Sequence, residues 1–490
     1  MLTVHLRIND PVTKQPTPVR LAITGPDGES YHPLGRSPLI PSGRYEALGG
    51  QLLWQGKRWA IIDGACEIRL PAEVPLLIEV SKGPEYVPLA ETVTLGPGQL
   101  ALRYTLERHC DLAAEGWYSG DTRCHGLSPH DALVEGEAEG IRFINLLAHE
   151  VELASLDGKT YPHTSNLLAF SGQKSLLGTE YAEVIVNTHN VHPALGRLAL
   201  LHTHRPVFPL QFGFIEANDD WSLHDWCEQG HRKKGLTIWT HPFAGQGTMI
   251  GGEALLCAHA GQIDAIEYDG GDKRLSFLPH YYRLLNAGIR LPLVGASGKE
   301  SNRTPIGAVR TYAHVEGEIT YPNWIEAIRR GCTFVTTGPL VRLRVDGRQP
   351  GECLQTAGPL QIEVDRLLAD ADKQSKIEVV ANGTVIGHGT DRIAMEYLMP
   401  QGGWIAARVW QANHSKGAGQ VTTMAHTSPI WVQPPGQPPR RDRSARPWLQ
   451  QAIDEVREWA NQTANYTDTK WRMQLLARCD AAEARVSELL

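Results

Sequence analysis

The stretch SLHDWCEQGHRKKG (222–235), followed by LTIWTHP (236–242), decides the fold. Its first part spaces apolar residues as an amphipathic helix does, and its second part is a short apolar run typical of a buried strand. The same order of helix and strand recurs in DALVEGEAEG before IRFINLLAH (141–149), GEALLCAHAG (252–261) before IDAIEYDGG, LSFLPHYYRLLNAG (275–288) before IRLPLVGAS, and YPNWIEAIRRG (321–331) before CTFVTTGP. This repeat predicts an α/β fold with a parallel sheet over 116–338, closed into a barrel.

β-rich segments flank this region on both sides. Residues 1–110 hold short β-rich runs separated by turn residues, which predicts an N-terminal β-sandwich, and residues 339–434 predict a second one. Residues 435–447 are rich in Pro and Arg and are interpreted as a linker. The tail 448–490 has helical spacing and predicts a helical hairpin whose Trp residues serve packing.

Charge and composition exclude several classes of protein. The 490 residues carry a net charge of −7 and no long run of like charges, which argues against nucleic-acid or polybasic membrane partners. No transmembrane stretch and no signal peptide are visible, so we expect a cytoplasmic protein, or a secreted one if a leader has been removed. The eight cysteines form no CxxC pair, so neither a zinc ribbon nor a disulfide framework is expected. Sheet edges and the helical tail could each support a homo-oligomer.

The chain holds 20 histidines, and those at strand ends are the better candidates for a functional role. In α/β barrels, chemistry takes place where the strands end. Three positions satisfy this condition: His241 after LTIWT, Glu267 and Asp269 at the end of IDAIEYD, and Ser297, Lys299 and Glu300 after LPLVGA. His241 is interpreted as a metal ligand or an acid–base group. The alternative is a histidine that is hydrogen-bonded in a loop.

Other candidates lie in loops. Asp121 and His125, in GWYSGDTRCHG, could supply two metal-binding groups, although an ordinary turn explains them as well. His202 and His204 form an HxH pair that would share one face of a strand. The HNVH segment (189–192) is interpreted as surface and is assigned no role.

Five segments together resemble the CehA/McbA-like metallohydrolases of the PHP (polymerase and histidinol phosphatase) superfamily. They are GDTRCH (120–125), WTHPF (239–243), LVGASGKES (293–301), RRGCTFVTTGPLVRLRVDGRQPGE (329–352) and AHTSPIWV (425–432). The similarity covers residues from about 60 to 490, and GCTFVTTGPLVRLRVDG is its most specific part. The resemblance implies a distorted (β/α)7 barrel with a metal site at the strand ends. It also implies hydrolysis of an ester, carbamate or phosphoester bond.

The chain departs from the family's metal motif. In G-D-x-H-x-H the first His is replaced by Arg123, and in G-S-D-x-H the Asp and His are replaced by Gly298 and Glu300. Arg197 stands where the family has His in a G-H pair. The resemblance retains His125, Glu180 and His241 as metal ligands. It leaves room for at most one divalent ion (Zn, Mn or Fe), with a metal-free site as the alternative.

Three functions follow as hypotheses. The first is a PHP-type hydrolase with one metal, in which Asp121 orients His125 or acts as base, and Arg123 and Arg197 bind an anionic or polar substrate. The second is a catalytically silent PHP-fold protein that serves binding or assembly. The third is a metal-independent hydrolase or lyase that uses Lys299, Glu300 or His241 as acid–base groups. For an enzyme we expect a small-molecule or carbohydrate substrate, and for the silent protein we expect the β domains to contact partners.

Overall fold

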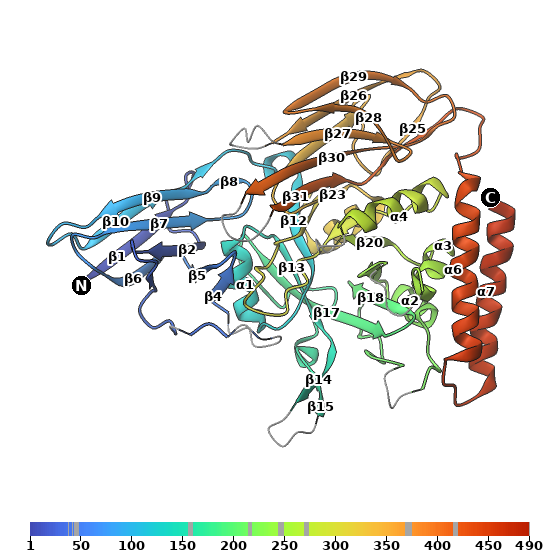
Figure 1. The fold of residues 1–490 in the computed structure, drawn as a ribbon, viewed down its shortest axis with the longest axis horizontal. Helices are drawn as coiled ribbons and strands as arrows, with labels where there is room; N and C mark the ends of the chain where they lie inside the picture. The colour runs from blue at the N-terminus through green and yellow to red at the C-terminus, as the bar shows by residue number, and fades with distance from the viewer. Residues whose placement is uncertain are drawn as a thin grey trace.

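The protein is strand-rich and mixed α/β, with a helical pair at its C-terminus (Figure 1). The computed structural model describes residues 1–37, 39–41, 43, 49–154, 160–213, 218–243, 249–268, 274–367, 375–414 and 420–489. Asp269, one of the residues singled out at strand ends, lies outside these ranges.

The N-terminal region consists of two main sheets around one apolar core. Its strands are β1 Leu2–Asn9, β2 Val19–Thr24, β3 Ser30–Tyr31, β4 Gln51–Trp54, β5 Lys57–Ile62, β6 Ala65–Leu70, β7 Pro75–Ser81, β8 Tyr86–Val87, β9 Leu89–Thr94, β10 Ala101–Thr105 and β11 Glu107–Arg108. One sheet has the order β10-β1-β6 and the other β4-β5-β2-β7-β9. Alternate residues of these strands point into the core, as Val4, Leu6 and Ile8 of β1 do.

The central region has the five helices that the sequence predicts, but strands and helices do not alternate throughout, because the described part of 143–201 holds six strands and no α-helix. Its strands are β12 Trp117–Cys124, β13 Phe143–Ala148, β14 Glu150–Ala154, β15 Thr160–Thr164, β16 Leu177–Gly178, β17 Glu183–His192, β18 Gly196–Leu201, β19 Leu236–Thr240, β20 Ala265–Tyr268, β21 Leu293–Gly295, β22 Arg310–His314 and β23 Thr333–Thr336. Its helices are α1 Pro129–Ala138, α2 Leu223–Arg232, α3 Gly252–His259, α4 Arg274–Asn286 and α5 Tyr321–Arg330.

The central sheet is only partly parallel. β12, β13 and β17 run parallel, as do β19, β20 and β21, but β18 is antiparallel to both of its neighbours, and so are β22 and β23. Among the described strands, the hydrogen-bonded order is open and has β21 at one edge, so the ladder does not close into a barrel. The sheet nevertheless curls. The amide of Gly298, just after β21, donates to the Arg123 carbonyl at 3.1 Å, and the His125 amide donates to the Lys299 carbonyl at 2.7 Å.

Helix α5 covers the apolar face inside this curl. Trp324 and Ile328 pack with Phe143, Ile185 and Ile238 in one buried cluster. The Trp324 indole donates to the Tyr118 carbonyl at 3.1 Å and lies directly over Gly120. A Cβ atom at Gly120 would come within 2.3 Å of the Trp324 ring, so the close approach of helix and strand requires glycine there.

The C-terminal β region continues the central sheet. Its strands are β24 Val341–Val345, β25 Cys353–Gln355, β26 Pro359–Arg366, β27 Lys376–Ala381, β28 Thr384–Gly389, β29 Arg392–Leu398, β30 Gly403–His414, β31 Gln420–Thr427 and β32 Ile430–Gln433. β23 pairs with β31, so one sheet runs through the boundary expected at residue 338, while β24-β26-β29 forms a separate sheet.

The predicted helical pair at the C-terminus is confirmed as α6 Arg446–Gln462 and α7 Thr469–Leu489. Figure 1 shows the two helices side by side beside α3. Trp448, Ile453 and Val456 of α6 and Cys479 of α7 are buried in the core that α2, α3 and α4 share. Their role is therefore packing, as expected.

All eight cysteines are free thiols. No described helix has both the length and the apolar character to cross a membrane.

Candidate functional site

Polar side chains gather where several central strands end. Arg123 and His125 lie at the end of β12, His149 follows β13, His189 lies in β17, His241 follows β19 and Glu267 lies in β20. The parallel strands β12, β13 and β17, and likewise β19 and β20, bring their carboxyl ends to one edge. The edge therefore combines residues that are far apart in the sequence.

Four histidines form the centre of this site. The ring centroid of His125 lies 4.1 Å from that of His149 and 5.3 Å from that of His189, and the His189 centroid lies 6.1 Å from that of His241. His125, His149 and His189 are buried, and His241 is partly exposed. Burial, together with the neighbouring histidines and Arg123, lowers the pKa of His125 and that of His189 far below the ordinary range. Both rings are therefore neutral at physiological pH.

Hydrogen bonds orient two of these rings. His125 Nδ1 lies 3.0 Å from the Leu147 carbonyl oxygen, which can only accept, so the neutral ring carries its proton on Nδ1 and its lone pair on Nε2. His189 Nε2 lies 3.0 Å from the Thr240 hydroxyl oxygen. The sequence interpretation of the 189–192 segment as surface is wrong, because His189 is only 4% exposed.

A buried ion pair lies beside the histidines. Arg123 Nη2 and Nε donate to the two carboxylate oxygens of Glu267 at 2.8 and 2.9 Å. Arg123 is 1% exposed and Glu267 is fully buried. A Cβ atom at Gly298 would lie 3.0 Å from Arg123 Nη2, so the backbone there also packs against the guanidinium. We expected the guanidinium of Arg123 to bind a substrate, but in the structure its Nε and Nη2 groups bind the Glu267 carboxylate.

Asp121 holds the strand-end loops together. Its carboxylate accepts the backbone N–H groups of Arg123 at 3.1 Å, Ser297 at 3.1 Å and Gly307 at 2.9 Å. Burial raises the pKa of Asp121, although these hydrogen bonds act in the opposite direction. The carboxylate therefore joins β12 to the segment after β21, which is a structural task rather than that of an open general base.

Lys299 also differs from its expected role. Its ammonium group is fully buried, lies 3.2 Å from the Glu135 carboxylate of α1, and donates to the carbonyls of Ser301 at 3.0 Å and Thr304 at 2.8 Å. These three partners satisfy the donors of an ammonium group. Glu300, Ser297 and Arg197 are partly exposed, and Arg197 pairs with Thr240 in the sheet register.

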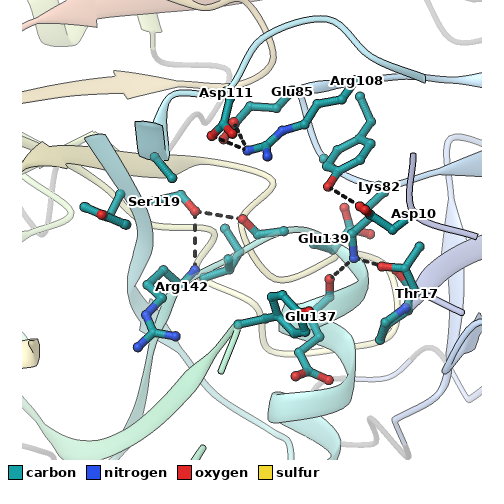
Figure 2. Close-up of a pocket in the computed structure, with 18 of the residues that line it drawn as sticks. Asp10, Thr17, Lys82, Glu85, Arg108, Asp111, Ser119, Glu137, Glu139 and Arg142 are labelled. Carbon is teal, nitrogen blue, oxygen red and sulfur yellow. Dashed lines mark hydrogen bonds and ion pairs between the residues drawn. The ribbon is translucent and has the colours of Figure 1, made fainter. Parts of the chain in front are cut away.

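The structure does not bring Glu180 to the histidines. Glu180 is exposed, precedes the first residue of β17, and its carbonyl accepts from Arg142 Nη1 at 2.6 Å. It therefore lies at the opposite edge of the sheet from His189. There it lines a separate cavity of about 450 Å³ between the N-terminal region and α1, where Lys82 and Arg142 lie (Figure 2).

The HxH pair also lies away from the site. Because β18 runs antiparallel, its end at Leu201 points to the edge opposite His241. His202 and His204 follow there, and the Nδ1 atoms of their rings contact the carbonyls of Lys234 and Lys233. These contacts indicate two loop histidines held by a neighbouring turn.

The residues at the strand ends do not fit the metal site that the resemblance implies. The Glu267 carboxylate is held through both oxygens by Arg123. Burial is the main cause of the lowered pKa of His125 and of His189, and the same guanidinium lowers both further, so a positive charge lies near both rings. Among the described residues, no group of three His, Cys, Asp or Glu side chains is arranged as metal ligands. A divalent ion bound there would be repelled by this guanidinium and would have to compete with it for the Glu267 carboxylate.

Comparison of the chain with known protein families, curated proteins and solved structures gave no match.

Proposed function

We propose that this chain is a PHP-type protein whose strand-end site binds a polar small molecule and no longer performs metal-dependent hydrolysis. The Arg123–Glu267 pair carries this proposal. A metal ion that recruited Glu267 would remove the two hydrogen bonds that Glu267 accepts from the buried Arg123 guanidinium. Removing one partner of a buried pair costs about 3–5 kcal/mol. The pair therefore opposes the binding of a catalytic metal.

The roles of Asp121 and Lys299 support the same proposal. Both are fully buried, and their hydrogen bonds hold the loop after β21 against β12 and α1. Proton transfer needs a group within hydrogen-bond reach of a substrate. These two side chains are instead engaged with the backbone or with α1, so they preorganise the mouth of the site.

A ligand would meet the partly exposed side chains of this edge. These are His241, Arg197, Ser297 and Glu300, which offer donors and acceptors of both charges. A polar small molecule, such as a carbohydrate or a small acid, matches this set.

Metal analysis of the purified full chain tests the proposal. After growth with added Zn and Mn, we expect less than about 0.2 metal ions per chain, because a catalytic zinc site would hold one. We also expect no turnover on a panel of esters, carbamates and phosphoesters. About one metal per chain, with turnover that His125→Ala abolishes, would overturn the proposal in favour of a single-metal hydrolase.

A metal-independent hydrolase is the second candidate, and the position of His241 favours it. Its backbone has a φ of 48°, a strained conformation for a non-glycine residue that is often kept at functional sites. It is also the partly exposed member of the four histidines. Turnover that resists chelators and is lost in His241→Ala but kept in His125→Ala would support this candidate over the first.

A further inference from the structure

A cavity of about 650 Å³ lies between α4, the C-terminal sheet and the segment that leads into α6. Figure 1 shows α4 running beneath the strands of this sheet. One face of α4 lines the cavity through Tyr282 and Asn286, and the strands contribute Glu378, Arg408 and Trp410. Its volume is within the range of ligand pockets, about 300–1,000 Å³.

The polar groups of this cavity are held in fixed orientations. Arg408 Nε and Trp410 Nε1 donate to the same oxygen of Glu378, Oε2, at 2.6 and 3.0 Å. Arg408 Nη1 donates to the Tyr282 hydroxyl at 3.0 Å. The guanidinium carbon lies 5.3 Å from the centre of the Trp410 ring and 5.9 Å from that of Tyr282. Arg408 is thus placed against both aromatic rings.

A buried histidine extends this network and fixes its direction. His426 Nδ1 lies 2.7 Å from the Thr427 carbonyl oxygen, so its proton is on Nδ1 and its Nε2 accepts from the Tyr282 hydroxyl at 2.8 Å. Burial lowers the pKa of His426 to about 3, which keeps the ring neutral. The Tyr282 oxygen is therefore left to accept from Arg408. This series of hydrogen bonds fixes the orientation of the Arg408 guanidinium. The Arg408 Nη2 group and Glu378 Oε1 take no part in it.

The charges that line the cavity balance. Arg283 and Arg408 are cations, and Glu378 and Asp442 are anions. A charged ligand would gain little from the net field of such a site. The hydroxyl groups of a neutral molecule can hydrogen-bond to the planar guanidinium and carboxylate groups. The C–H faces of such a molecule can pack against aromatic rings. We propose that this cavity is a binding site for a neutral saccharide, separate from the strand-end site and independent of its function.

Isothermal titration calorimetry on the full chain tests this site with maltotriose, cellotriose and triacetylchitotriose. A tri-galacturonate serves as the charged comparison. We expect at least one neutral trisaccharide to bind with a dissociation constant below about 10 mM. Glu378→Gln and Trp410→Leu should each weaken that binding by about tenfold or more, which corresponds to 1.4 kcal/mol.

Trp431→Leu is the matched control. Trp431 is also partly exposed in the C-terminal sheet and contacts Arg290, but it does not line the cavity. The Trp431→Leu variant should bind the sugar with the same affinity as the native chain. If Glu378→Gln fails to fold, Asp442→Asn at the rim replaces it. The proposal is overturned if no neutral trisaccharide binds, if only the charged one binds, or if the cavity variants bind as well as the control.

Discussion

Replacing Arg123 by Met tests whether the buried ion pair is essential to the central region. The substitution keeps much of the side-chain length but leaves the carboxylate of Glu267, which is fully buried, without the two hydrogen bonds at 2.8 and 2.9 Å. An uncompensated buried charge costs about 3–5 kcal/mol, whereas an exposed pair would contribute at most about 1 kcal/mol. For a cooperative unit of about 150–250 residues, such as the central region (116–338), a loss of about 3–5 kcal/mol in stability corresponds to a fall in Tm of about 6–20 °C.

The assay is differential scanning calorimetry of Arg123→Met, Glu267→Leu and the double variant at pH 7. Because each single variant leaves one charge buried and the double variant leaves neither, the double variant should unfold at a higher temperature than either single one. The coupling energy should be about 2 kcal/mol or more, as expected for residues in direct contact. Losses below about 1 kcal/mol in the single variants, or losses that simply add, would refute the reasoning.

The remaining predictions concern metal, pH and packing. Arg123→Ala removes the cation beside the neutral imidazoles of His125 and His189 and releases Glu267, so the variant should bind more Zn²⁺ than the native chain; equal zinc content by elemental analysis would contradict this. The folded-state pKa values of His125 and His189 lie below the unfolded value of about 6.5, so stability should fall as pH drops below 6.5, by up to about 1.4 kcal/mol per pH unit for each histidine. Chemical denaturation of His189→Gln between pH 4.5 and 7.5 should give a shallower slope than the native chain. Gly120→Ala should cost about 1–3 kcal/mol because its Cβ would lie 2.3 Å from the Trp324 ring, whereas Gly96→Ala, with open space around it, should leave the melting temperature unchanged.

Local pattern predicted the five helices of the central region and the strands that follow them, but it assigned Asp121 and His125 to a loop, whereas Asp121 lies in β12 and His125 follows that strand. The sequence predicts a helix over 222–235 and a strand over 236–242, and the structure has them at Leu223–Arg232 and Leu236–Thr240. These elements depend on periodicity within a few turns of chain. The antiparallel direction of β18 and the pairing of β23 with β31 depend on contacts far apart in the sequence, which no local pattern contains.

The candidate site was predicted in part. His241 and Glu267 lie at strand ends as the strand-end rule suggests, and His125, which was expected in a loop, follows β12 at the same edge. His149 obeys the same rule, since it ends the apolar run IRFINLLAH, and this could have identified it.

His189 was missed in the sequence analysis because the residues around it are polar. The polar run around it resembles a loop, but Asn187 contacts the Tyr321 hydroxyl and Asn190 donates to the Val207 carbonyl. These distant partners satisfy the amides and allow a polar strand to be buried.

The pairing of β23 with β31 has a consequence for how the chain can be divided. Phe334, Val335 and Thr336 share a backbone ladder with Thr427, His426 and Ala425. A chain cut after residue 338 would lose that ladder and present β23 as a bare strand edge, which favours aggregation. A fragment that keeps this ladder must therefore extend through β31, and a hinge between the central and C-terminal regions would have to break main-chain hydrogen bonds before it could open.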